Sequence, residues 1–110
     1  MKIEFKTKTL EKNLCDEREM QKEYGALANK LRIRMGMLSS AENLAEISHL
    51  PPFKRHELIG NRKGQYGIYI NENYRLILEP NHNPVPVKPD GGYDLTRITS
   101  VRILDVEDYH

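Results

Sequence analysis

The sequence predicts an α+β fold of two layers, with helices in the first half of the chain and an antiparallel sheet in the second. Between residues 9 and 38, apolar side chains recur every three or four positions, which is the period of an amphipathic helix. After Pro51 and Pro52, short runs of β-branched and aromatic residues alternate with turn sequences. Helices followed by strands, rather than alternating with them, indicate helices packed on one sheet.

The helical half begins with a short strand and contains two helix boundaries. Residues 2–6, "KIEFK", alternate charged and apolar side chains and predict a half-buried strand. Asp16 with Glu19 resembles a capping box, and Gly25 can end one helix and start the next. We therefore expect two helices rather than one long rod. A short third helix is expected to begin at Ser39 and to stop at the proline pair.

The second half of the chain predicts a meander joined by tight turns. Its strands are expected at residues 53–59, 65–70, 74–79 and 100–107. Residues 80–100 contain four prolines and the turn sequence "PDGG", and this segment is longer than most loops of compact domains. We expect it to form an extended, two-armed insertion within a single domain that spans residues 1–110.

Composition narrows the class of protein. With 38% hydrophobic and 30% charged residues the chain fits a globular protein, and no apolar run has the length of a membrane span. The charged N-terminus has no signal-peptide core, and one cysteine, Cys15, excludes an internal disulfide, so we expect a cytoplasmic protein. The net charge is only +1, but residues 53–75 carry five basic and two acidic side chains, a local charge of +3. This local excess of positive charge modestly favours the binding of nucleic acid.

No motif in the sequence specifies a cofactor or a metal ion. The chain lacks a phosphate-binding glycine loop, a paired-cysteine motif and a nucleophile elbow, and its four histidines lack the spacing of zinc ligands. The candidates that remain are acid–base groups and cations. They are His56, Arg62, Lys63, Arg75, Asp108, Tyr109 and His110.

Each of these candidates also has a structural interpretation. A lone strand histidine such as His56 is more often a satisfied structural residue than a catalyst. Arg75 lies inside an apolar strand, where an arginine needs a partner or a groove. The carboxylates available to pair with it are Asp105, Glu107 and Asp108. For the tyrosine of the terminal tripeptide the structural alternative is packing at the edge of the sheet.

Taken together, these groups suit the cleavage of RNA. A base removes the proton of a 2′-hydroxyl, which attacks the adjacent phosphate, while an acid protonates the departing 5′-oxygen and cations stabilise the charge on the phosphate. An imidazole can serve as base or acid near neutral pH, so the sequence leaves open whether His56 or His110 is the base. The closing "DYH" is then either a catalytic tail or the polar end of a strand.

Three segments contain a specific combination of residues: "HELIGNRKGQYGIYINENYRLILEP", the "KPDGG" turn and the closing "VRILDVEDYH". A histidine, Gly-x-Arg-x-Gly, a tyrosine–arginine strand and a terminal Asp-Tyr-His, in that order, resemble the HigB-like plasmid-maintenance killer proteins of the RelE/ParE toxin superfamily. The resemblance implies a RelE-like fold, with two N-terminal helices packed on a twisted, mostly antiparallel sheet. It also implies an mRNA endonuclease that acts in the ribosomal decoding site. Its partner would be a helix-turn-helix antitoxin of the HigA type, through which alone it would meet operator DNA.

The resemblance assigns the catalytic set to His56, Asp108, Tyr109 and His110, with no cofactor and no metal. The last strand is expected to pair into the sheet and to bring the tail beside His56. In this assignment Asp108 orients an imidazole, and Tyr109 stacks on a base or contacts a phosphate. Contacts to RNA phosphates are assigned to Lys54, Arg55, Arg62, Lys63 and Arg75.

Two other functions stay open at this point. The same superfamily contains toxins that inhibit DNA gyrase and cleave nothing, and a shared fold does not fix the function. Those toxins generally lack the acid–base tail, so His56 together with "DYH" favours the ribonuclease. The other alternative is an inactive member of the family that only binds its antitoxin.

Overall fold

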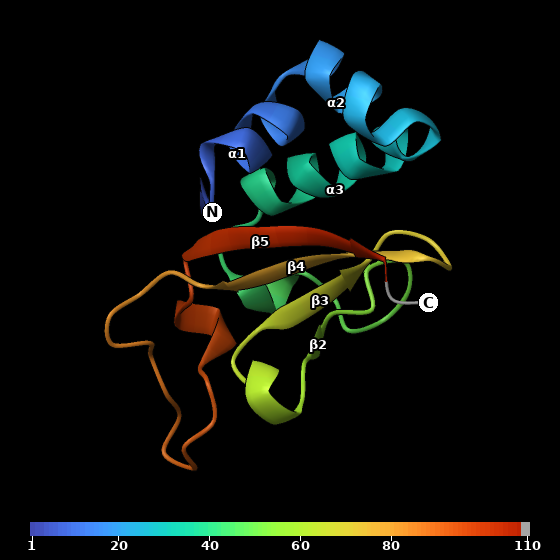
Figure 1. Ribbon diagram of the computed structural model, residues 1–110. Coiled ribbons are helices and arrows are strands. Elements are labelled where there is room, and N and C mark those ends of the chain that lie inside the picture. Colours follow the sequence, from blue (N-terminus) through green and yellow to red (C-terminus); the bar gives the residue numbers. More distant parts are fainter. Residues whose placement is uncertain (109–110) are drawn as a thin grey trace.

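The chain folds into two layers, with helices covering one face of a five-stranded sheet (Figure 1). The computed structural model describes residues 1–108, so Tyr109 and His110 lie outside the described residues. This arrangement confirms the α+β class. The helices are α1 (Lys8–Cys15), α2 (Glu17–Tyr24) and α3 (Ala28–Ser40). The strands are β1 (Lys2–Phe5), β2 (His56–Glu57), β3 (Tyr66–Tyr69), β4 (Tyr74–Pro80) and β5 (Ser100–Asp108).

The helical region breaks at two positions rather than one, which corrects the expectation of two helices. Asp16 is extended between α1 and α2, and its Oδ1 accepts hydrogen bonds from the N–H groups of Arg18 and Glu19 at 2.9 and 3.0 Å. The predicted cap is therefore confirmed, but the residue that starts α2 also ends α1. Gly25, with a φ of 53°, ends α2 as predicted. None of the helices within residues 1–108 combines the length and the apolar character that a membrane span requires.

A single 3₁₀ turn, Leu44–Glu46, stands where a third helix was expected. Ser39 does not begin a helix because it lies in the last turn of α3. The Arg55 guanidinium donates hydrogen bonds to the backbone carbonyls of Leu44, at 3.3 Å, and of Ile47. The expected helix is thus replaced by an irregular segment that is tied to the chain just before β2.

The strands are ordered β1–β5–β4–β3–β2, so the last strand is inserted between the first and the fourth. β1 runs parallel to β5, and the other three pairs are antiparallel, which confirms a mostly antiparallel sheet. The β4–β5 register shifts between Ile77 and Leu78, the signature of a bulge. β2 is much shorter than the expected strand at 53–59, because Lys54 has a φ of 47° and interrupts the extended backbone.

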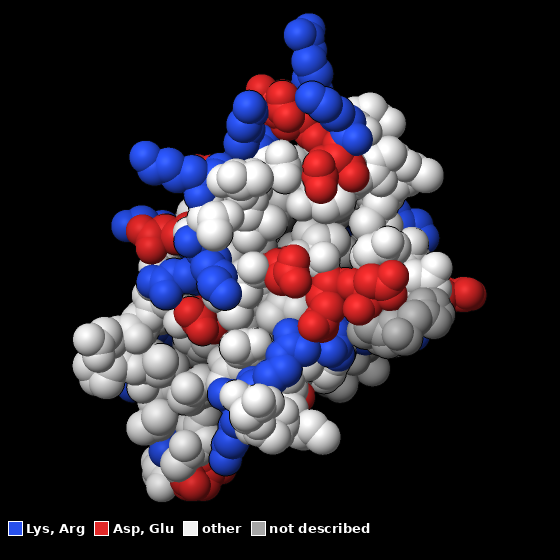
Figure 2. All heavy atoms as spheres, viewed as in Figure 1, with Lys and Arg blue, Asp and Glu red and all other residues white. Residues whose placement is uncertain are grey.

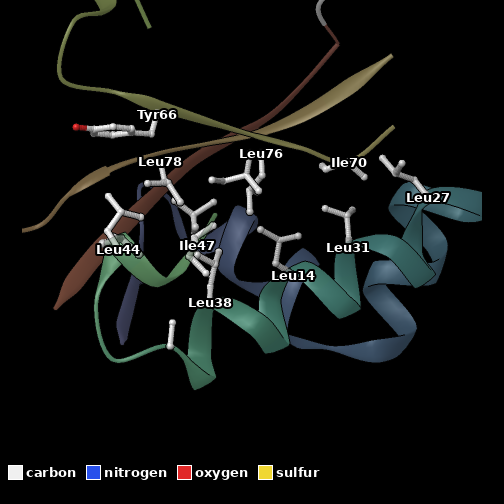
Figure 3. Packing of buried hydrophobic residues seen from close by; sticks show 14 of the residues in the cluster. Leu14, Leu27, Leu31, Leu38, Leu44, Ile47, Tyr66, Ile70, Leu76 and Leu78 are labelled. Atoms are coloured by element: carbon white, nitrogen blue, oxygen red, sulfur yellow. The ribbon is translucent and has the colours of Figure 1, made fainter. Parts of the chain in front are cut away.

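The core lies between α3 and one face of the sheet (Figure 3). Side chains alternate along a strand, so Leu76 and Leu78 of β4 face the helices while Arg75, which precedes Leu76, faces away. Figure 3 shows Leu31 and Leu38 of α3 directed toward this face. The apolar stripe predicted for the helices is largely confirmed as core. Its fully or nearly fully buried members are Met20, Leu27, Leu31 and Leu38.

Residues 80–100 leave the sheet as two arms that meet in a tight turn, on the side away from the helices (Figure 1). Val87 and Tyr93 form a β-bridge between the arms. At the tip, the Lys88 N–H donates to the Gly92 carbonyl at 2.7 Å, and Gly91 takes a φ of 94° that glycine adopts without strain. The "PDGG" sequence therefore makes the turn that its composition predicts.

Replacing Asp16 by alanine removes both hydrogen bonds to the N-terminal end of α2. We expect Asp16→Ala to lower the free energy of unfolding by about 1 kcal/mol, measured by urea denaturation. Asp16→Asn keeps a side-chain acceptor and should cost less than half as much. Equal losses in the two variants would contradict the capping role of Asp16.

Candidate active site

His56 lies on the face of the sheet that the helices leave uncovered. It is paired in register with Gly67 of β3, which points away from the core because its neighbours Tyr66 and Ile68 point into it. The His56 Nδ1 lies 2.9 Å from the carbonyl oxygen of Lys54. A carbonyl can only accept, so Nδ1 carries the proton, and in the neutral ring Nε2 keeps its lone pair. This is the tautomer of a base that acts through Nε2.

Gly67 makes room for the imidazole. A Cβ atom at Gly67 would lie 2.9 Å from Cε1 and 3.0 Å from Nε2 of His56, and 3.4 Å from Cδ of Arg75. The φ of Gly67 is not positive, so the backbone conformation does not require a glycine here. The close approach of the His56 ring does require one. Gly67 was not identified from the sequence. A lone glycine inside a strand is the signal that identifies such a close approach.

Glu107 holds two arginines beside His56. Its Oε1 accepts a hydrogen bond from Arg62 Nη1 and its Oε2 accepts one from Arg75 Nε, both at 2.8 Å. Arg75 and Glu107 face each other across β4 and β5, and Arg62 arrives from the 3₁₀ turn Gly60–Arg62. The salt bridge considered as the structural alternative for Arg75 is thus present, and it joins a second cation to the first.

This bridge is partly accessible, and its charges are fixed. The side chains of Arg62, Arg75 and Glu107 are 35%, 20% and 23% exposed. Burial alone would raise the pKa of Glu107, but the hydrogen bonds and charges of the two arginines outweigh it and hold the pKa below its usual 4.5. Glu107 is therefore ionised at neutral pH, and the three groups together carry one net positive charge.

Two open depressions flank His56 and Arg75. The smaller, of about 200 Å³, lies between these two side chains, Lys54 and Tyr69, and the Lys54 Nζ sits 4.4 Å from the centre of the Tyr69 ring. The larger, of about 320 Å³, is lined by His56, Glu57, Leu58, Ile59, Arg62 and Arg75. Both depressions thus present an imidazole and at least one cation to a ligand. Among residues 1–108, no group of three His, Cys, Asp or Glu side chains lies close enough to hold a metal ion.

A buried arginine of α3 positions the segment before His56. The Arg34 Nε donates a hydrogen bond to the Tyr69 carbonyl at 2.8 Å, and its guanidinium lies 5.2 Å from the centre of the Phe53 ring. Burial lowers the pKa of Arg34 from its usual value. The Tyr69 N–H in turn donates to the Phe53 carbonyl at 2.7 Å. Arg34 was not identified from the sequence, because a charge beside an apolar stripe is usually solvated.

Not every predicted site residue joins this cluster. The Arg55 guanidinium hydrogen-bonds the backbone carbonyls of residues 44, 45 and 47, and burial lowers its pKa. Arg55 therefore has a structural role, and its contact with a phosphate stays a prediction. Lys63 is exposed at the end of the turn after Arg62 and lines different grooves from His56. Figure 2 shows basic side chains running in a band from the acidic patch near the end of β5 toward the arms of residues 80–100.

The terminal tripeptide is only partly described. Asp108 is exposed and is paired in register with Tyr74 at the end of β5. Because side chains alternate, it projects from the opposite face to Glu107. Strands β4 and β3 separate β5 from His56. Tyr109 and His110 lie outside the described residues, so their approach to His56 stays a prediction.

The family described as "RelE-like toxin of type II toxin-antitoxin system HigB" matches residues 3–87. The chain belongs to this family of HigB-like toxins. Its matched range includes His56, Arg62 and Arg75. A relative, Toxin HigB-1 of Vibrio cholerae serotype O1, is 34% identical over 80 residues, which cover 72% of this HigB-like toxin and 83% of the relative.

Solved structures share the fold of this HigB-like toxin. The YoeB/ParE toxin from Agrobacterium tumefaciens superposes over the full length of both chains with a TM-score of 0.58 at 12% identity. The YoeB–YefM complex from Staphylococcus aureus gives a TM-score of 0.55 at 17% identity, over 100% of this chain and 97% of the other. At such low identities the likeness concerns the fold, and it confirms the RelE-like architecture expected from the sequence.

The lowered pKa of Glu107 makes a pH-dependent contribution to stability. Because the folded-state pKa lies below the unfolded value, this contribution is present above about pH 4.5 and is lost as the pH falls through the folded-state pKa. We expect Glu107→Gln to lower the free energy of unfolding by about 1 kcal/mol at neutral pH.

Urea denaturation at a series of pH values measures this difference. The gap between wild type and Glu107→Gln should narrow as the pH is lowered below about 4.5. Glu72→Gln, at an exposed turn position, is the matched control and should behave like the wild type. A gap that stays constant down to acidic pH would contradict the charge pairing of Glu107 with Arg62 and Arg75.

Proposed function

We propose that this HigB-like toxin is a ribosome-dependent mRNA endonuclease that works without a metal ion in the cytoplasm. The observation that carries the proposal is the geometry of His56. Its Nδ1 proton is held by a carbonyl, and its ring lines an open depression together with Arg62 and Arg75. Family membership supports the proposal, because toxins of this family are generally endoribonucleases. A base, an open site and paired cations are what cleavage through a 2′-hydroxyl requires.

In the proposed reaction, Nε2 of His56 takes the proton of the 2′-hydroxyl. The resulting oxygen nucleophile forms a bond to the adjacent phosphorus, and the bond from phosphorus to the 5′-oxygen breaks. Arg62 and Arg75 donate hydrogen bonds to the phosphate oxygens as negative charge accumulates on them. We assign the proton for the departing 5′-oxygen to His110 and a stacking or phosphate contact to Tyr109. Asp108 projects from the face opposite to Glu107, so the proposal that it orients the His110 ring requires the chain to turn back across the end of β5.

The proposed partners of the toxin are an antitoxin, the ribosome and mRNA. The family description names a toxin–antitoxin system, and one neighbour in fold is the YoeB–YefM complex. We propose that a helix-turn-helix antitoxin of the HigA type binds this toxin, and that operator DNA is reached only through it. Lys54 and Lys63, both near the uncovered face, are assigned to phosphates of the ribosome or of the mRNA.

His56→Ala removes the proposed base. We expect well over a tenfold loss of cleavage in a reconstituted translation reaction, with mRNA ends mapped by primer extension, and a comparable loss for His110→Ala. The control is Lys22→Ala, an exposed substitution on α2 far from β2, which should cleave like the wild type. Near-normal cleavage by His56→Ala would overturn the assignment. Growth arrest with intact mRNA under all conditions would favour the inhibition of gyrase instead.

Gly67→Ala tests the fit around His56 without removing an ionisable group. The added methyl group must displace the imidazole, so we expect a loss of cleavage of about tenfold to a hundredfold, mainly in the turnover step. Gly36→Ala on α3 is the matched control, because a Cβ there meets nothing within 4 Å, and it should keep full activity. Thermal unfolding should show both variants folded. Full activity of Gly67→Ala would contradict the need for this placement of His56.

A further inference from the structure

A groove separate from the two His56 depressions opens beside the arms of residues 80–100. Its volume is about 510 Å³, and its wall is formed by residues 63–65 before β3, by strands β4 and β5 and by both arms. The residues that matter for its chemistry are Lys63, Gln65, Asn81, His82, Tyr93 and Arg102. It is larger than either depression at His56, and the proposed reaction does not use it.

This groove lies on the same face of the sheet as His56. Gln65 precedes the core residue Tyr66, and Glu79 follows the core residue Leu78, so strand alternation directs both away from the helices. Glu79 is four residues beyond Arg75 on β4, a separation of about 13 Å at the rise of a strand. A stacked nucleic-acid strand covers this length with about four nucleotides, and an extended strand needs fewer.

The wall of the groove is built from positioned donors. Arg102 donates from Nη1 to Glu79 at 3.2 Å and from Nη2 to Asn81 at 2.9 Å, which fixes the plane of its guanidinium. The His82 Nε2 accepts the N–H groups of Thr99 and Ser100 at 3.0 and 3.2 Å, so its proton sits on Nδ1 and makes that nitrogen a donor. Lys63 adds an exposed ammonium.

Tyr93 adds an aromatic ring to the groove. The Tyr93 side chain is half-buried against the turn at Gly64, with its hydroxyl 3.2 Å from the position that a Cβ of this glycine would take. A ring held in this way offers a stacking surface to a base. A second groove next to it, of about 500 Å³, has two carboxylates, Glu57 and Asp90, against the single ammonium of Lys63. The first groove has one carboxylate, Glu79, against Lys63 and Arg102, so it is electrostatically better suited to phosphates.

We propose that the first groove is a subsite for single-stranded RNA. It holds nucleotides about two to four positions from the scissile phosphate, on one side of it. Lys63 and Arg102 bind backbone phosphates, and Tyr93 with the His82 Nδ1 contacts a base. The inference rests on the proposed function, because it requires the same RNA strand to pass His56. It gives the segment of residues 80–100 a role in holding the substrate.

The test uses ribosomes programmed with mRNA that carries a 2′-deoxynucleotide at the cleavage position and one 4-thiouridine nearby. The position of the thiouridine is varied from one to six nucleotides on each side. After irradiation with the toxin, mass spectrometry identifies the crosslinked residue. We expect crosslinks to Tyr93 or its immediate neighbours from positions two to four on one side only. Lys63→Glu should reduce their yield at least fivefold, whereas Lys30→Glu, an exposed change on α3, should not.

The outcomes separate this inference from the proposed function. Cleavage of normal mRNA by the wild-type toxin, with no crosslink to residues 80–102 from any position, would overturn the subsite and leave the ribonuclease intact. Crosslinks whose yield is the same in Lys63→Glu as in the wild type would overturn the phosphate role of Lys63. The absence of cleavage by the wild type would contradict the proposed function and the subsite with it. A circular dichroism spectrum of Lys63→Glu confirms that a lower yield does not come from unfolding.

Discussion

The burial of one face of the sheet beneath α3 determines which side chains the other face can carry. Strand side chains alternate, so the positions that place Leu76 and Leu78 in the core also place Arg75 on the uncovered side. The uncovered side is therefore free to carry polar groups whose desolvation the core does not tolerate. Arg34 connects the two layers, because this buried arginine of α3 holds the Tyr69 carbonyl at the end of β3 and packs on Phe53 just before β2.

On the uncovered face, a few close contacts set the geometry. Glu107 joins Arg62 to Arg75, Gly67 leaves space for His56, and the Lys54 carbonyl fixes the proton on Nδ1 of that ring. The Glu107 carboxylate keeps the positive charges of Arg62 and Arg75 close together. Because this bridge is partly exposed, both guanidinium groups can bind an approaching phosphate. These contacts join β2, β3, β4, β5 and the turn at Arg62, so the site forms only when these four strands have paired.

The sequence predicted those features that depend on local chemistry. Asp16 and Gly25 bound α2 as expected, because caps and left-handed glycines act within a few residues. The strand order was not predictable, since β1 pairs with β5 and brings Lys2 opposite Ser100. From the sequence, Glu107 is one of three carboxylates that could pair with Arg75. Its link to Arg62 becomes visible only when the register is known. A lone glycine such as Gly67 indicates a close approach, but only the register shows that the approaching side chain is His56.

We propose that the fold prepares His56 to act as a base through Nε2. Long-range ¹H–¹⁵N spectra of the toxin with labelled histidines test it most directly, with His56→Gln used to assign the signals. At a pH where the ring is neutral, we expect a protonated Nδ1 and an unprotonated Nε2 for His56. A neutral ring that carries its proton on Nε2 would contradict it, because that nitrogen would then be unable to accept the proton of a 2′-hydroxyl.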